Sequence, residues 1–323
     1  MADQLFKFLF DGAEAQRSSV RGEIVALEDA WREIYSRHDY PAPVLRLLGE
    51  MVAASALLTA NLKFNGTLIM QIHGDGPLRL LVVECNADLT LRATAKLADD
   101  AVVDDDSGFA QLVNTHGRGR FVMTLDPRDR RRGQQPYQGV VPLEGDSVAD
   151  ALGNYMLRSE QLDTHLWLAA DEHCAKGMLL QRLPQDGGTP ANDPTLSDED
   201  ADLERAQETW RRAITLANTL ERAELLAATP ETLMHRLFWE ETLRVFEPLS
   251  CVFACSCSRE RVGAMLLTLG RPEVDATLEQ EGHVLVHCEF CNKGYEFDRV
   301  DCVQLFATSN PVDGVRSPLG QRH

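Results

Sequence analysis

Cysteines are the residues of this chain with the most evident chemistry. Six of the eight lie in the last quarter of the sequence, where Cys255 and Cys257 form a C-x-C pair and Cys288 and Cys291 form a C-x-x-C pair. Two close pairs separated by a longer segment can surround a tetrahedral Zn²⁺, with sulfur about 2.3 Å from the metal. The spacing therefore predicts a zinc site with four cysteine ligands.

The residues alone leave two interpretations of this site open. In the first, the zinc is purely structural and stabilises a small domain that lacks a sufficient core. In the second, the site is redox-active, because zinc keeps its ligands as thiolates, which are the oxidisable form of cysteine. Oxidation would then release the binding free energy that folds the domain.

Four other residues near the two pairs are further candidates. Cys251 and Cys302 could compete for zinc or join a non-native disulfide. His283 and His287 are possible ligands, but both are predicted to be surface or strand residues, since His287 directly precedes Cys288 and points to the other face of a strand.

Composition is typical of a globular protein and excludes several classes of partner. The chain has 323 residues, of which 44% are hydrophobic and 25% charged, and its formal net charge is −18. Such an acidic chain does not offer the positive field that nucleic-acid phosphates or anionic membrane surfaces attract. We therefore expect neither nucleic acid nor a membrane as the main partner.

No segment is predicted to cross a membrane. The longest apolar stretch, Val44–Leu62, is interrupted by Arg46, Glu50 and Asn61 and is predicted to be a buried helix. The N-terminus has no basic segment ahead of an apolar run, so no signal peptide is expected, and the predicted location is the cytoplasm.

The first 195 residues are predicted to form an α+β domain of mainly antiparallel sheets packed on helices. A helix is expected over Val148–Arg158 with Ser147 as its N-cap. Cys85 and Cys174 lie in apolar strand contexts and are expected in the core. The predicted strands are Thr67–His73, Leu78–Cys85, Leu89–Ala95, Phe121–Leu125, Gly139–Leu143, Thr164–Ala170 and Met178–Leu183.

A change in composition at Gln185–Pro194 marks a predicted linker, after which two charged helical segments are expected within 197–247. The first is expected to begin at Ser197 and the second at Thr229, before a proline. Their apolar faces are narrow, so these helices must pack against another part of the protein to be stable. They are either a plain connector or an element that docks when the zinc domain is folded and detaches when it is not.

The last part of the chain is predicted to contain two helices and two short strands around the cysteine pairs. The predicted helices are Ser258–Leu267 and Glu273–Glu281, and the predicted strands are His283–His287 and Tyr295–Asp298. The predicted domains are a core of residues 1–195, a helical linker of 196–249, a zinc-binding domain of 250–306 and a disordered tail of 307–323.

Several segments together resemble the thirty-three-kilodalton heat-shock chaperone family, and they occur in that family's order along nearly the whole chain. They are Leu57–Phe64, Gln71–Leu78, Tyr137–Leu143, Tyr155–Gln161, Phe253–Val262, Leu269–Gly270 and Cys288–Asn292. The resemblance implies a cytosolic, ATP-independent holdase, which is a chaperone that binds unfolding proteins and protects the cell under oxidative stress and heat.

The resemblance also implies a redox cycle and assigns its residues. In the reduced, inactive state Cys255, Cys257, Cys288 and Cys291 would bind one zinc ion per chain. Hypochlorite, or peroxide with heat, would convert them to the disulfides Cys255–Cys257 and Cys288–Cys291, with loss of zinc and unfolding of the linker. The oxidised form would dimerise and bind unfolded client proteins. Because a holdase needs an apolar surface that stays hidden until activation, the N-terminal sheet is the expected client surface.

Cys251 and Cys302 are additional to the family's four-cysteine pattern, and the arginine run at 128–132 lies outside its motifs. Two other functions would each use part of these residues. A thiol-disulfide oxidoreductase could use Cys288 and Cys291, but no thioredoxin-like βαβ pattern surrounds them. A zinc-ribbon nucleic-acid module is opposed by the net charge of −18. The protein is therefore predicted not to be an enzyme.

Overall fold

The structure, a computed structural model, describes residues 3–11, 19–62, 65–129, 135–184 and 196–308, with side chains in the last range described for 203–307. The chain divides into two compact units, Met1–Ala254 and Cys255–His323. The predicted linker at 185–194, residues 309–323 of the predicted tail and most of the arginine run lie outside the described residues, whereas residues 307 and 308 of that tail belong to a helix.

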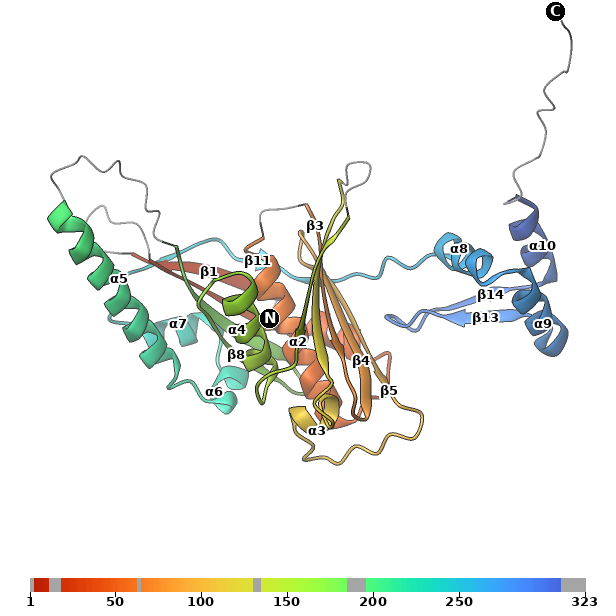
Figure 1. Ribbon diagram of the computed structural model, residues 1–323, viewed down its shortest axis with the longest axis horizontal. Coiled ribbons are helices and arrows are strands. Elements are labelled where there is room, and N and C mark those ends of the chain that lie inside the picture. Colours follow the sequence, from red (N-terminus) through yellow and green to blue (C-terminus); the bar gives the residue numbers. More distant parts are fainter. Residues whose placement is uncertain (1–2, 12–18, 63–64, 130–134, 185–195, 309–323) are drawn as a thin grey trace, which may run out of the picture. The chain divides into compact units, whose positions relative to one another are not determined.

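The first unit contains two six-stranded sheets, shown in Figure 1. One has the order β10-β1-β2-β9-β8, with β11 also beside β1, and all of its pairs are antiparallel. Its strands are β1 (Gln4–Phe10), β2 (Val20–Leu27), β8 (Thr164–Ala170), β9 (Ala175–Arg182), β10 (Leu243–Val245) and β11 (Leu249–Ser250).

The second sheet has the order β12-β5-β4-β3-β6-β7, in which β12 is parallel to β5 and the other pairs are antiparallel. Buried and half-buried side chains alternate along β3, as expected for a sheet with one face on the core. The strands are β3 (Gly66–His73), β4 (Leu78–Asn86), β5 (Thr90–Leu97), β6 (Arg120–Pro127), β7 (Tyr137–Pro142) and β12 (Val252–Phe253).

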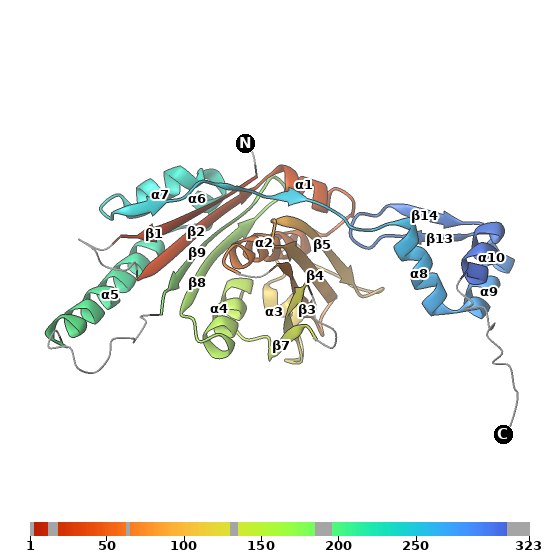
Figure 2. The same ribbon diagram turned by 90° about the horizontal axis from the view of Figure 1, so that it is seen from above.

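Helix α2 (Ala42–Thr59) lies between the two sheets, as Figure 2 shows. Its length and apolar composition would suit a membrane span, but 78% of it is buried inside the protein. A Cβ atom added at Gly49 would lie 2.4 Å from the Cβ atom of Ala170, so the helix packs closely against β8. The prediction of a buried central helix and the predicted α+β class of antiparallel sheets and helices are confirmed.

Three further helices flank these layers in the first unit: α1 (Asp29–Tyr35), α3 (Phe109–Val113) and α4 (Val148–Ser159). The Ser147 side chain accepts a hydrogen bond from the backbone N–H of Asp150, which confirms the predicted N-cap of α4.

The outer face of the first sheet is covered by α5 (Leu196–Ala217), α6 (Arg222–Ala227) and α7 (Pro230–Phe238) (Figure 2). The rings of Phe10 and Phe238 meet edge to face at 5.1 Å in the apolar core between them. Thr229 accepts a hydrogen bond from the backbone N–H of Thr232, so α7 begins where the sequence predicts.

Two expectations for this region were wrong, and one helix was not predicted. The second helical segment ends at Phe238 and does not continue to 247, because residues 243–245 form β10 and satisfy edge groups of β1. Helix α5 begins at Leu196, before the predicted start at Ser197. Helix α6 between the two segments was not predicted.

The second unit contains helices, a hairpin and a small core. Its elements are α8 (Arg259–Leu269), α9 (Arg271–Glu281), β13 (Val284–His287), β14 (Gly294–Phe297) and α10 (Arg299–Thr308). The buried core of this unit consists of Leu266, Val274, Leu278, Val284, Tyr295, Phe297 and Cys302. Such a core is small for an independent unit, so an additional cross-link is expected.

Glu23 of β2 predicts a pH dependence of the first unit's stability. Burial raises its pKa to about 7, although the charges of Lys7 and Arg21 oppose the shift. Because the folded state binds this proton more tightly than the unfolded state, stability is lost as pH rises from about 4.5 to about 7. Between pH 4.5 and pH 8 the native chain should therefore lose about 3 kcal/mol of unfolding free energy that Glu23→Gln does not lose, because glutamine does not titrate.

Urea unfolding of both proteins at these two pH values measures the effect. A difference between native chain and Glu23→Gln that stays constant with pH would contradict the assignment to this carboxyl group.

Candidate metal centre

The first cysteine pair lies in an extended segment immediately before α8. The Ser258 side chain caps this helix by accepting a hydrogen bond from the backbone N–H of Arg261, at 3.3 Å. The Arg261 guanidinium in turn donates to the backbone oxygen of Ser256, at 2.9 Å. These contacts fix the backbone between Cys255 and Cys257.

The second pair occupies the turn between β13 and β14. The Cys288 backbone N–H donates to the Lys293 oxygen at 3.0 Å, and the Asn292 N–H donates to the Cys288 oxygen at 2.8 Å. Asn292 has a φ of 55°, a left-handed conformation that asparagine adopts more readily than most residues. This turn points the side chains of Cys288 and Cys291 to a common point.

The four sulfur atoms converge. The Sγ atoms of Cys255 and Cys288 are 3.7 Å apart, and those of Cys257 and Cys291 are 3.4 Å apart. All four Sγ atoms lie within 4.8 Å of one another. In a tetrahedral site with Zn–S distances of about 2.3 Å, neighbouring sulfurs are about 3.8 Å apart. The donor set and its spacing fit a closed, tetrahedral site for a soft metal ion.

A tyrosine hydroxyl adjusts the acidity of the cluster. Burial disfavours the Cys257 thiolate, but hydrogen bonds from Tyr295 and from the neighbouring cysteines outweigh burial and lower the Cys257 pKa to about 7. The Tyr295 Oη donates to the Cys257 Sγ at 3.0 Å. Burial raises the pKa of Cys291 to about 12, so a metal ion that binds this sulfur would displace its proton.

The contact of Tyr295 with this site was not predicted from the sequence. Its position on β14, four residues after Cys291, was the available signal. The hydroxyl direction depends on the hairpin register, in which Tyr295 pairs with Val286.

The remaining cysteines and the two histidines lie outside the cluster. Among the described residues, the cluster that could bind a metal contains only the four named cysteines. Cys251 is buried in the first unit, and Cys302 is buried in the core of the second. Cys85 and Cys174 are buried, as predicted. All eight cysteines lie within the described ranges, and none of them is joined to another in a disulfide there.

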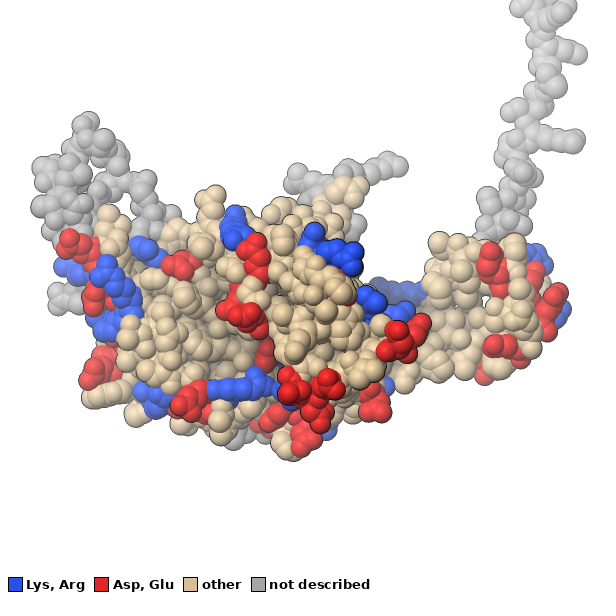
Figure 3. Space-filling view, turned by 60° about the horizontal axis from the view of Figure 1, so that its bottom comes forward, with Lys and Arg blue, Asp and Glu red and all other residues tan. Residues whose placement is uncertain are grey.

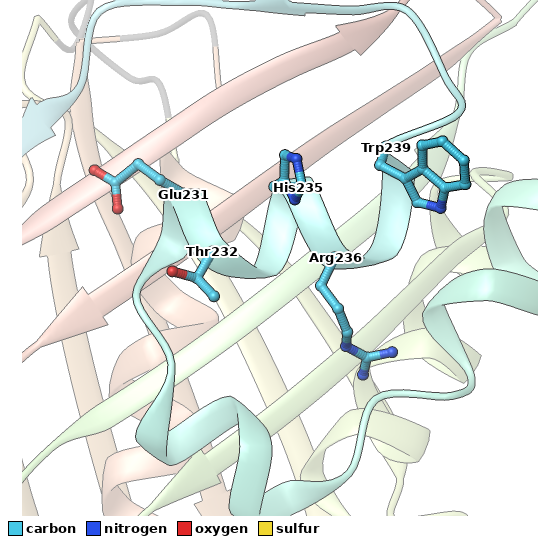
Figure 4. Close-up of a pocket in the computed structure, with 5 residues that line it drawn as sticks. All are labelled: Glu231, Thr232, His235, Arg236 and Trp239. Carbon is cyan, nitrogen blue, oxygen red and sulfur yellow. The ribbon is translucent and has the colours of Figure 1, made fainter.

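A second surface feature is a shallow depression on the outer face of α7, shown in Figure 4. The side chain of Trp239 is 68% exposed there, while Arg236 is bound to Glu224 and to the Thr219 hydroxyl. The lining comes from one helix and its C-cap, so the depression has no converging set of reactive groups. It is lined by Glu231, Thr232, His235, Arg236 and Trp239.

Comparison with known proteins connects this centre to a family. The model of the Hsp33 protein family matches residues 3–298, which include both sheets and all four clustered cysteines. The chain belongs to the Hsp33 family. Relatives named 33 kDa chaperonin extend the agreement: that of Chromobacterium violaceum is 48% identical, with 94% of each chain covered.

Two further comparisons agree with the Hsp33 assignment. The 33 kDa chaperonin of Methylobacillus flagellatus is 44% identical over 97% of this chain and 98% of its own. The crystal structure of the 33 kDa chaperonin from Thermotoga maritima superposes with a TM-score of 0.75 and covers 95% of this chain and 98% of that one. At 21% sequence identity, this last likeness shows the fold of an Hsp33 protein.

On the face of this Hsp33 chain that Figure 3 displays, acidic and basic side chains are interspersed. The formal net charge of −18 belongs to the whole sequence. The charges of this face therefore offer no extended basic surface for a polyanion.

Proposed function

We propose that this Hsp33 protein is an ATP-independent, redox-regulated holdase whose four clustered cysteines control its binding of unfolded proteins. The family assignment and the name of its relatives support chaperone activity and a non-enzymatic role. The observation that carries the redox proposal is the convergence of four cysteine sulfurs within 4.8 Å.

In the reduced state, Cys255, Cys257, Cys288 and Cys291 would bind one Zn²⁺. The bound ion supplies a cross-link between the segment before α8 and the β13–β14 turn. The apparent binding free energy of structural zinc is about 10–16 kcal/mol, which exceeds what a core of this size contributes. Folding of the second unit would therefore depend on the four thiolates.

Oxidation would remove those thiolates in pairs. Cys255 and Cys257 give up two electrons to one molecule of hypochlorite or peroxide and form one S–S bond, and the oxidant leaves as chloride and water or as water alone. Cys288 and Cys291 react in the same way. Sulfurs joined at about 2.05 Å no longer offer four thiolate ligands, so the second unit loses its cross-link.

The helices α5, α6 and α7 are the proposed responsive element. They cover apolar side chains of the first sheet, among them Phe6, Phe8 and Phe10. The same stretch of chain continues through β10, β11 and β12 to Phe253, two residues before Cys255. Release of these helices would expose an apolar sheet face of the kind that binds unfolded chains.

The finer assignments belong to the same proposal. The protein acts in the cytoplasm, forms a homodimer when oxidised, and has unfolded client proteins as partners rather than nucleic acid or membranes. The division into a core of 1–195, a linker of 196–249 and a zinc-binding domain of 250–306 describes how the switch would work. The oxidoreductase alternative has little support, because the C-x-x-C pair lies in a hairpin turn rather than in a βαβ unit.

Native mass spectrometry tests the metal part of the proposal, with peptide mapping of thiols after oxidation. We expect one zinc per chain in the reduced protein and the disulfides Cys255–Cys257 and Cys288–Cys291 after hypochlorite treatment. A reduced chain that is free of zinc while its second unit is fully protected from hydrogen exchange would contradict the proposal.

A further inference from the structure

We propose that the Tyr295 hydroxyl slows the oxidation of Cys257 and so helps to set the oxidant concentration at which the cysteine cluster opens. This inference rests on the proposed function, because it concerns the same four sulfurs. The Tyr295 Oη donates a hydrogen bond to the Cys257 Sγ at 3.0 Å. Tyr295 is not one of the four clustered ligands, so it would regulate the reactivity of a ligand rather than bind the metal.

The position of the Tyr295 hydroxyl is restricted by the hairpin and by the core of the second unit. Tyr295 pairs with Val286 across β13 and β14, and its side chain is 6% exposed in the same core as Phe297. The Lys293 Nζ lies 5.3 Å from the centre of the Tyr295 ring, which is a cation–π distance. Such a buried ring has few alternative rotamers, so the hydrogen bond is in place before an oxidant arrives.

The hydrogen bond to Cys257 comes from a side chain, whereas two other sulfurs of the cluster receive hydrogen bonds from the backbone. The Cys257 N–H donates to the Cys255 sulfur, and the Lys293 N–H donates to the Cys291 sulfur. Backbone donors are present whatever side chain stands at their position. Tyr295 is therefore a position at which one substitution changes the surroundings of a single sulfur without removing a ligand.

A hydrogen bond to a thiolate makes its sulfur a weaker nucleophile, because the donor draws electron density from the lone pairs that attack an oxidant. Ligand sulfurs are deprotonated when zinc is bound, so in the zinc-loaded protein they would differ in nucleophilicity rather than in the fraction of thiolate. Hydrogen bonds to metal ligands in other proteins have effects of about 10–100-fold on metal affinity or activity.

The step that Tyr295 would slow is the first bond formation at Cys257. The Cys257 thiolate attacks one oxygen of hydrogen peroxide, so an S–O bond forms, the O–O bond breaks and hydroxide leaves. The Cys255 thiolate then attacks the Cys257 sulfur, so an S–S bond forms and the second oxygen leaves as hydroxide. The two thiolates lose two electrons, and the peroxide is reduced to two hydroxide ions. Because the first attack draws on the electron density that the hydroxyl binds, the hydrogen bond raises its barrier.

Tyr295→Phe removes the hydroxyl and keeps the buried ring. The reduced, zinc-loaded full-length protein is treated with peroxide and a 1,3-diketone that traps sulfenic acids, and peptide mapping locates the trapped cysteines. We expect the initial rate of trapping at Cys257 to rise about three- to tenfold, with the initial rate at Cys291 unchanged. Tyr35→Phe is the matched control, because the Tyr35 Oη donates to the Glu172 oxygen at 2.7 Å in the first unit. This control should react like the native chain.

Co²⁺ in place of zinc gives a second readout that does not depend on an oxidant. Without the hydroxyl, the Cys257 sulfur gives up electron density more readily. The sulfur-to-cobalt charge-transfer band of Tyr295→Phe should therefore move to longer wavelength, and that of Tyr35→Phe should not. Incorporation of 3-fluorotyrosine at position 295 strengthens the donor, so this protein should show a band at shorter wavelength and slower trapping at Cys257.

The possible outcomes separate this inference from the proposed function. If the native chain binds zinc and loses it on oxidation, but Tyr295→Phe is trapped at Cys257 no faster, the role of Tyr295 is overturned and the proposed function stands. Equal acceleration at Cys257 and Cys291 would also overturn that role, because it would indicate general loosening of the cluster. If Tyr295→Phe does not retain zinc, unchanged trapping in the 3-fluorotyrosine protein overturns it. A native chain without zinc would overturn both proposals.

Discussion

Replacement of Cys255 with serine is expected to reduce the zinc content of the reduced protein from one ion per chain to almost none. Three thiolates and a hydroxyl are a poor substitute for four thiolates, because the neutral serine oxygen is a hard, weak ligand. Since apparent binding free energies of structural zinc are about 10–16 kcal/mol, loss of the site should unfold the second unit. Hydrogen exchange should then show loss of protection over 255–308, while α2 and the strands β2, β3, β4, β8 and β9 stay protected.

Cys302→Ala is the matched control for Cys255→Ser. Cys302 is a buried thiol of the same unit, but it lies in the apolar core and outside the four-cysteine cluster. Its truncation removes only packing and should cost about 1 kcal/mol with zinc retained. Retention of zinc and of exchange protection by Cys255→Ser, or equal losses in both variants, would contradict the assignment of the ligands.

Replacement of Lys176 with methionine is expected to loosen the helices that cover the first sheet. The Lys176 side chain is 7% exposed, and its Nζ donates to the backbone oxygens of Leu226 and Ala228, at 2.8 and 2.9 Å. Methionine has a similar length but no donor, so both carbonyls at the end of α6 would lose a partner. If the free energy that holds α6 and α7 on the sheet falls by about 2 kcal/mol, the population of molecules with these helices detached rises about 30-fold.

Hydrogen exchange of α6 and α7 measures this loosening, and we expect partial chaperone activity of Lys176→Met without oxidant. Arg211→Met is the matched control, because Arg211 lies on an exposed part of α5. Its guanidinium forms an ion pair with the Glu208 carboxylate at 3.6 Å. Such pairs contribute about 0–1 kcal/mol, so this variant should exchange like the native chain. Unchanged exchange of α6 in Lys176→Met would show that these hydrogen bonds do not retain the helix.

Short-range patterns in the sequence were sufficient for much of this molecule. The spacing of the four cysteines indicates a common site, and the structure places their sulfurs within 4.8 Å. The apolar surface of Val44–Leu62 predicts a buried helix, and α2 is that helix. Ser147 and Thr229 predict helix starts because a capping side chain acts on backbone groups only three residues away.

Features that depend on distant partners were not predicted. Val245 fits the apolar spacing of a helix, yet it lies in β10 because the edge of β1 offers backbone hydrogen bonds there. The role of Tyr295 depends on the register of β14 with β13 and on the position of Cys257. Propensity and spacing carry no information about such long-range pairing, which tertiary packing decides.

Light scattering of a heat-denaturing client protein, recorded with the reduced and the oxidised forms of this chain, tests the central claim most directly. If the four thiols control access to an apolar surface, the oxidised protein suppresses aggregation at a molar ratio near one to one, and the zinc-loaded reduced protein does not. Equal suppression by both forms, or by neither, would contradict the redox control proposed here.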